Sequence, residues 1–123
     1  MSSETVRVRR EDGAWWVTLN RPPHNVLTVA MMGELRAALD EAFRDSAARA
    51  VVFTAEGRSF CAGVDVAEHT AERVGEMLAA FHGLCRTVAY ADVPTVAAVA
   101  GPALGGGCEL VALCAVVVAR QAA

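Results

Sequence analysis

The chain of 123 residues has no basic block, and its formal net charge is −3. A nucleic-acid-binding surface needs clustered lysines and arginines, so nucleic acid is not an expected partner. The four cysteines form no C-x-x-C pair, and no secretory signal precedes them: they are Cys61, Cys85, Cys108 and Cys114. We therefore expect reduced thiols, a cytoplasmic location, and four small apolar side chains that are buried in the core.

Other motifs are missing as well. His24, His69 and His82 lack the spacing of metal ligands, so no metal is expected. The glycine run at 105–107 is not followed by Lys-Ser or Lys-Thr and does not spell G-x-G-x-x-G, which disfavours a phosphate-binding loop and a dinucleotide site. With 54% hydrophobic and 20% charged residues, and no repeat or low-complexity linker, the chain suits one domain with a sizeable core.

The long apolar stretch Val93–Ala119 contains only one charged residue, Glu109, and it is long enough to suggest a membrane span. Pro102, the run Gly105–Gly107 and a carboxylate in mid-span are each awkward in a lone helix in lipid. The preceding sequence also follows the pattern of a water-facing α/β domain. We therefore expect no membrane partner, and the span is kept as an alternative.

The order of the segments indicates an α/β domain. Asp12-Gly13 predicts a tight hairpin between the first two strands, and Thr28 is a suitable N-cap for the first helix. Hydrophobic spacing then alternates between strand and helix periods. The expected strands are 5–10, 14–19, 50–54, 95–100 and 115–119, and the expected helices are 28–44, 71–90 and a short one that carries Glu109.

Two loops with small side chains lie where strands would lead into helices: Ala62-Gly63-Val64 and Gly105-Gly106-Gly107. Their backbone N–H groups, if aimed at one point, would form an oxyanion hole. Glu109 lies about one helical turn beyond the glycines, within reach of proton transfer there. A carboxylate in so apolar a stretch needs a partner or a role if it is buried. The alternative is a structural acid in the first turn of a helix.

Taken together, four segments resemble the enoyl-CoA hydratase/isomerase (crotonase) family. They are Leu19-Asn20-Arg21-Pro22, Asn25-Val26-Leu27, Phe60–Val66 and Ala100–Leu110. The resemblance implies a crotonase-like fold of repeated β-β-α units and an acyl-CoA thioester substrate, with no cofactor because coenzyme A is part of the substrate. It also implies a trimer or dimer of trimers for the full-length form.

By matching position, the resemblance implies that the N–H groups of Val64 and Gly106 bind the thioester oxygen. It also implies that Glu109 is the acid/base catalyst. The resemblance further implies that these two loops and the segment at 24–26 bind the substrate. The full substrate-binding set is His24, Val26, Ala62, Gly63, Val64, Asp65, Val66, Leu104, Gly105, Gly106 and Glu109.

The chain also departs from the family pattern. Family hydratases carry a second glutamate further on, expected beyond residue 123, and a C-terminal helical region that supports trimer formation. A Cys-Asp pair usual in the family is here Cys114-Ala115. We therefore expect residues 1–123 to be a truncated, partial crotonase-like domain.

Two functions of different class follow. The first is an enoyl-CoA hydratase, with an enoyl-CoA isomerase as the alternative. The sequences of residues 21–27 and of Ala30-Met31-Met32 are similar to those of hydratases that act on cyclic dienoyl-CoA thioesters. The second is a non-catalytic remnant that acts as a binding or interaction module and self-associates through open strand edges.

Four other residues have simpler expected roles. We expect Asp65 to cap a helix, and Trp15 and Trp16 to be packing residues. Arg58 is either a contact for CoA phosphates or a solvated arginine.

Overall fold

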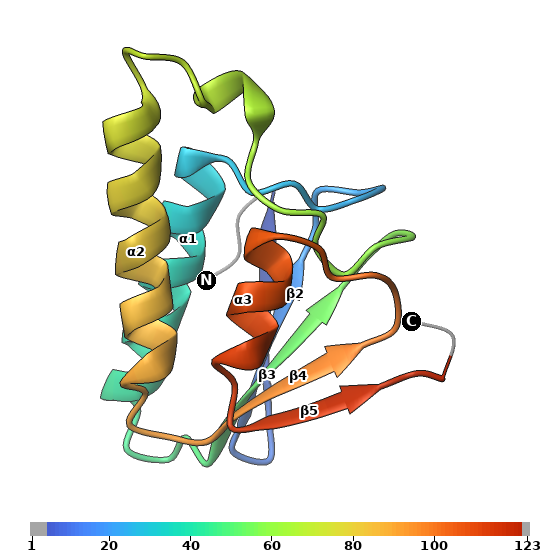
Figure 1. Cartoon of the computed structure of the whole chain (residues 1–123). Coiled ribbons are helices and arrows are strands. Elements are labelled where there is room, and N and C mark those ends of the chain that lie inside the picture. Colours follow the sequence, from blue (N-terminus) through green and yellow to red (C-terminus); the bar gives the residue numbers. More distant parts are fainter. Residues whose placement is uncertain (1–4, 122–123) are drawn as a thin grey trace.

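A computed structural model describes residues 5–121 and contains a single five-stranded sheet within them. The strands follow one another in space as they do in the sequence, in the order β1-β2-β3-β4-β5 (Figure 1). Only β1 and β2 are antiparallel, joined by the hairpin at Asp12-Gly13, and the later strands are parallel. The strand bounds are β1 Val6–Glu11, β2 Ala14–Leu19, β3 Ala50–Ala55, β4 Thr95–Val99 and β5 Val116–Ala119.

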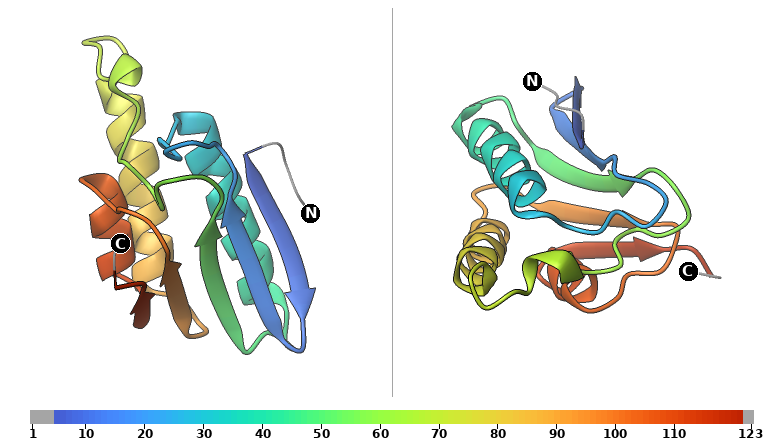
Figure 2. Two further views of the ribbon diagram at one scale, coloured as in Figure 1. Left: turned by 90° about the vertical axis from the view of Figure 1, so that its right-hand side faces the viewer. Right: turned by 90° about the horizontal axis from the view of Figure 1, so that it is seen from above.

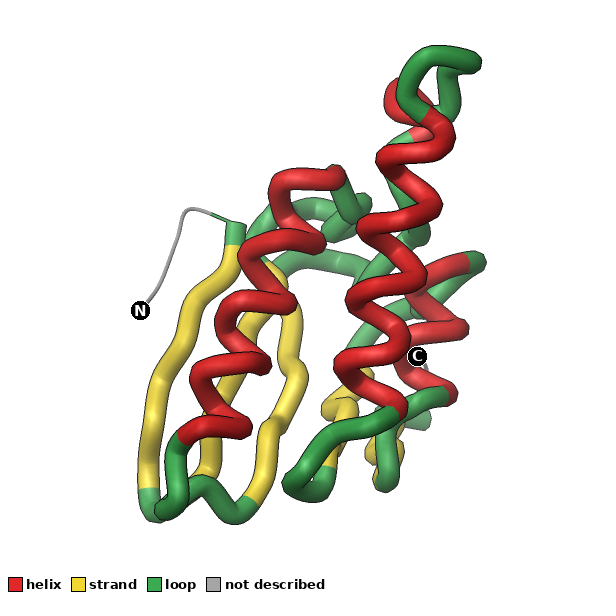
Figure 3. Tube along the Cα trace, turned by 90° about the vertical axis from the view of Figure 1, so that its left-hand side faces the viewer, coloured by secondary structure: helices red, strands yellow, loops and turns green. Residues whose placement is uncertain are grey.

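Helices connect the parallel strands. α1 (Val29–Arg44) leads from β2 to β3, α2 (Val74–Ala89) precedes β4, and α3 (Gly106–Ala112) precedes β5. A short 3-10 helix, η1 (Val66–Glu68), lies between β3 and α2. Figures 2 and 3 show α1 and α2 side by side against one face of the sheet, with α3 next to α2. The connections from β3 and β4 to the following helices therefore meet at one end of the sheet.

The core lies between this face of the sheet and α1 and α2. Alternation along β2 turns Trp15, Val17 and Leu19 inward, and all three are buried. α1 begins at the Thr28 N-cap, whose hydroxyl accepts a hydrogen bond from the Met31 N–H at 3.1 Å. Trp15 is a packing residue as expected, whereas Trp16 is half-buried, with the Arg9 guanidinium 5.1 Å from its ring centroid.

The apolar stretch Val93–Ala119 is not one helix. It divides into β4, a loop, α3 and β5, and no helix among residues 5–121 is long and apolar enough to cross a membrane. All four residues of β5 are exposed, including Val116 at 50% and Val118 at 60%. β5 is the last strand in the sheet order, and nothing among residues 5–121 pairs with its outer edge. Strands of parallel sheets are normally covered on both faces, so the exposure of β5 is unusual.

The prediction of four buried cysteines is wrong in part. Cys61 is buried, Cys85 and Cys114 are half-buried, and Cys108 is exposed. Cys108 is exposed because of the orientation of α3, which turns Gly107 and Leu110 inward and points the two residues between them, Cys108 and Glu109, toward solvent.

Candidate active site

Two loops from separate strand–helix connections run side by side. Cys61 pairs with Ala103 in a parallel bridge, and the Leu104 N–H donates to the Cys61 carbonyl at 2.9 Å. The Phe60 N–H donates to the Pro102 carbonyl, also at 2.9 Å. These main-chain bonds place the predicted segment 62–66 beside the predicted segment 104–106.

The contact is close at the glycines themselves. A β-carbon on Gly63 would lie 3.8 Å from the nitrogen of Gly106 and 3.5 Å from the Leu104 carbonyl oxygen. Gly63 has φ of +117° and Gly105 has φ of +54°, a backbone conformation that favours glycine. The missing side chains let the two backbones approach each other and leave Gly106 half-buried.

The main-chain N–H groups of Val64 and Gly106, the two predicted donors, have no acceptor among residues 5–121. Leu27 binds the Gly63 carbonyl and the Asp65 N–H, each at 2.8 Å, on one side of the segment. Because successive residues of an extended chain point to opposite sides, the N–H of Val64 faces away from Leu27. Gly106 is the first residue of α3, where N–H groups have no partner within the helix.

The segment at 24–26 packs against the first of these loops. The Ala62 N–H donates to the His24 carbonyl at 2.9 Å, and the His24 ring Nδ1 lies 2.7 Å from the Ser59 hydroxyl. His24 is exposed and Val26 is half-buried. The structure therefore brings both predicted residues to the same end of the sheet as Val64.

Asn25 organises this segment, a role that the sequence analysis did not assign. Its side chain is fully buried at 0% exposure, its Oδ1 accepts from the Arg21 N–H at 2.7 Å, and its Nδ2 donates to the carbonyls of Glu56 and Ser59. Its φ is +50°, which asparagine tolerates better than most residues. In the sequence, the position of this asparagine directly after Pro-Pro-His is the pattern that could have indicated its role in the loop.

Asp65 and Glu68 have structural contacts. Asp65 Oδ1 accepts from the Ala67 N–H at 2.9 Å, which confirms the expected cap, and its Oδ2 lies 3.8 Å from the Arg21 guanidinium. Glu68 was missed: it is 8% exposed, accepts from the Val29 N–H at 2.8 Å, and lies 3.2 Å from the Arg73 guanidinium. It joins η1 to the start of α1. No pattern in the sequence links positions 68 and 29.

Glu109 is exposed, so the cost of a buried carboxylate does not arise in this structure. It lies in the first turn of α3, and its N–H donates to the Gly105 carbonyl at 3.1 Å. Burial and, second, the negative charge of Glu109 raise the pKa of the Cys85 thiol on α2. Glu109 therefore lies near α2 as well as next to the glycine loop.

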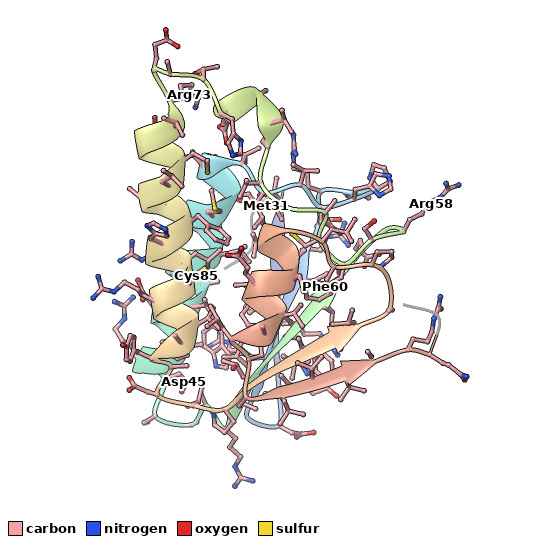
Figure 4. All side chains as sticks on the ribbon, in the orientation of Figure 1. Met31, Asp45, Arg58, Phe60, Arg73 and Cys85 are labelled. Carbon is pink, nitrogen blue, oxygen red and sulfur yellow. The ribbon has the colours of Figure 1, made fainter. Side chains whose placement is uncertain are left out.

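The remaining predicted residues lie on the rim of the loops. Val66 is 82% exposed and Leu104 is 58% exposed, while Ala62 is half-buried. Arg58 lies in the loop after β3, where its N–H donates to the Pro23 carbonyl at 2.9 Å, and its side chain extends outward from this loop in Figure 4. Among the described residues, no three histidine, cysteine or acidic side chains gather in a way that could hold a metal ion.

The fold and the paired loops define a crotonase-type α/β domain, and solved structures agree. An enoyl-CoA hydratase from Mycobacterium smegmatis matches with a TM-score of 0.89 and 34% identity, over 95% of this chain and 48% of that one. An enoyl-CoA hydratase from Bacillus anthracis matches with a TM-score of 0.91 and 30% identity, over 97% of this chain and 48% of that one.

The sequence comparisons name the family. The family model for enoyl-CoA hydratase/isomerase matches residues 9–123, and the chain belongs to this family. A Rhizobium meliloti protein named a probable enoyl-CoA hydratase is 41% identical over all of this chain and 49% of its own length. The cyclohexa-1,5-dienecarbonyl-CoA hydratase of Thauera aromatica is 37% identical over 87% of this chain and 42% of its own length. The chain thus spans about half the length of these relatives.

Proposed function

We propose that this chain binds an acyl-CoA thioester and polarises its carbonyl through the N–H groups of Val64 and Gly106. The observation that carries the proposal is the contact between the two loops, with Gly63 facing the Gly106 nitrogen and neither donor bonded among residues 5–121. Two N–H groups from separate loops stabilise an oxygen that gains negative charge. Coenzyme A arrives as part of the substrate. The residues that we place beside it are His24, Val26, Ala62, Gly63, Asp65 and Val66.

The reaction that we propose is the hydration of an enoyl-CoA. Polarising the thioester draws electrons from the double bond and makes the β-carbon electrophilic. Water adds its oxygen to the β-carbon while Glu109 takes a proton from that water, and Glu109 returns this proton to the α-carbon when the enolate collapses, which regenerates the carboxylate. No oxidant or reductant enters this balance. An isomerase would instead move the double bond without taking up water, so incorporation of labelled water oxygen distinguishes the two.

The proposal extends to the acyl group of the substrate and to the assembly of the protein. The 37% sequence identity with a cyclohexa-1,5-dienecarbonyl-CoA hydratase and the sequence of residues 21–27 support a cyclic dienoyl-CoA thioester as the substrate. The family resemblance supports a trimer or dimer of trimers for a full-length form, in the cytoplasm.

The test is the loss of absorbance of a conjugated enoyl-CoA on incubation with the protein. Glu109→Gln keeps the size of the side chain and removes the base, so the rate should fall by about 100-fold or more. Glu72→Gln changes an exposed acid elsewhere and should leave the rate unchanged. Equal rates in the wild type and Glu109→Gln would overturn the role of Glu109.

A second candidate is thioester binding without turnover. Family hydratases use two acids, and the other acids beside the loops are already engaged: Asp65 with Ala67 and Arg21, Glu68 with Val29 and Arg73. Saturable binding of an acyl-CoA with no absorbance loss would favour this candidate over the hydratase.

A further inference from the structure

Phe81 of α2 lies against the start of α3. A β-carbon on Gly106 would be 3.1 Å and 3.2 Å from two carbons of the Phe81 ring, and 3.6 Å from a methyl carbon of Val64. The ring is 8% exposed. Figure 4 shows Cys85 on the side of α2 that is turned toward α3, and Phe81 lies one helical turn before it on the same side.

The first turn of α3 has little packing of its own. Gly105, Gly106 and Gly107 have no side chains, and only Gly107 and Leu110 of this seven-residue helix are buried. Gly107 is held against Cys61 by close backbone contact. At Gly106 the nearest side chains are those of Phe81 and Val64, so the ring of Phe81 fills the place that a side chain at 106 would take.

We propose that Phe81 is a positioning residue, whose ring sets the direction of the Gly106 N–H relative to the N–H of Val64. The inference rests on the proposed function, because it concerns the donors of the oxyanion hole. Such donors act only when they lie about 2.7–3.1 Å from the oxygen that gains charge. A displacement of about 1 Å at a remote contact is enough to lower a rate by about 100-fold.

The alternative is that Phe81 is only a core residue. It falls on the apolar stripe of α2 with Met77, Leu84 and Val88, which pack toward the core. A core role predicts that shortening Phe81 lowers stability and nothing else. A positioning role predicts, in addition, a loss of carbonyl polarisation at unchanged affinity for the CoA part of the ligand.

Phe81→Leu separates the two roles. The probe is a conjugated enoyl-CoA, whose absorption moves to longer wavelength when hydrogen bonds polarise its thioester carbonyl, and free CoA serves as the ligand that lacks this thioester carbonyl. We expect Phe81→Leu to lose most of the red shift while its Kd for free CoA changes by less than about threefold. Phe43→Leu, a half-buried phenylalanine on α1, is the matched control and should keep the full shift.

A red shift in Phe81→Leu equal to that of the wild type overturns the positioning role and leaves the proposed function intact. The absence of a red shift in the wild-type chain overturns the proposed function, and this inference with it. If Phe81→Leu does not fold, Phe81→Met supplies the same comparison with a side chain of closer volume.

A second pair of variants tests the contact itself. Gly106→Ala keeps the N–H but forces the Phe81 ring to move by a few tenths of an ångström, so it should reduce the red shift. Adding Phe81→Leu makes room for the new methyl group, and the double variant should regain part of the shift lost in Gly106→Ala. A double variant whose losses simply add would contradict the inference.

Discussion

A β-carbon at position 107 would lie 2.2 Å from the carbonyl oxygen of Cys61 and 2.8 Å from its Cβ. The start of α3 therefore touches the first loop at a point where only glycine fits, since backbone atoms cannot move aside as a flexible side chain can. This contact fixes the distance between the two loops that carry Val64 and Gly106.

Gly107→Ala should consequently lower the free energy of unfolding by about 3 kcal/mol, or prevent folding, because α3 must move away from Cys61. Gly33→Ala is the matched control: Gly33 lies in α1 with no atom within 4 Å of its added β-carbon, and alanine there should raise stability by up to about 1 kcal/mol. Urea denaturation measures both. Equal stability of Gly107→Ala and wild type would show that the loops are not packed as described.

Glu68→Ala should cost about 1–3 kcal/mol of stability, because the Val29 N–H at the start of α1 loses its acceptor and Arg73 loses its partner. Glu68→Gln keeps an acceptor oxygen and should cost less. Glu72→Ala changes an exposed acid of the same segment and should stay within about 0.5 kcal/mol of wild type. Thermal unfolding of the three variants decides, and a loss in Glu72→Ala as large as in Glu68→Ala would count against the capping role.

Asp45 gives a pH dependence of known sign. The Trp15 Nε1–H donates to it at 2.8 Å and the Ala47 N–H at 2.9 Å, and these bonds hold the pKa of Asp45 below its usual value. A lowered pKa in the folded state adds stability above the unfolded-state pKa, and that stability disappears as the pH falls through the folded-state pKa.

Trp15→Phe removes the largest cause, so the pKa of Asp45 should rise toward its usual value and the acid limb of the stability curve should flatten. Carbon NMR of the Asp45 carboxyl group against pH measures this. An unchanged pKa in Trp15→Phe would exclude the indole hydrogen bond as its cause.

Glu109→Gln should lower the pKa of the Cys85 thiol, since the negative charge of Glu109 is one of its two causes, after burial. More thiolate is then present at a given pH, and alkylation of Cys85 should be faster. Mass spectrometry of the Cys85 peptide measures the rate, with Cys114 as the internal reference and Glu76→Gln as the control variant. No acceleration would place the Glu109 carboxylate away from α2.

Local features of this fold are readable from the sequence. Thr28 and the apolar spacing of α1 predict its start and its end at Arg44, and Asp12-Gly13 predicts the hairpin, in which both residues have positive φ. Each depends on contacts within a few residues. The resemblance to the family supplied the remaining order of the fold, because local pattern does not say which parallel strands are neighbours.

The parts that sequence reasoning missed are contacts between distant positions. Glu68 holds Val29, and Phe81 packs on Gly106, although nothing in the local pattern pairs them. The exposure of Glu109 was also not foreseen, because its neighbours are apolar and only the rotation of α3 decides which of them face inward.

The most direct measurement of the central claim is amide NMR of the Val64 and Gly106 N–H groups during titration with an acyl-CoA thioester, with free CoA as the reference ligand. The account predicts that both amide protons move downfield on binding the thioester and stay unchanged, or nearly so, with free CoA, because free CoA lacks the thioester carbonyl that would accept these hydrogen bonds. If the thioester binds and both amides keep the positions that they have with free CoA, the oxyanion hole is contradicted.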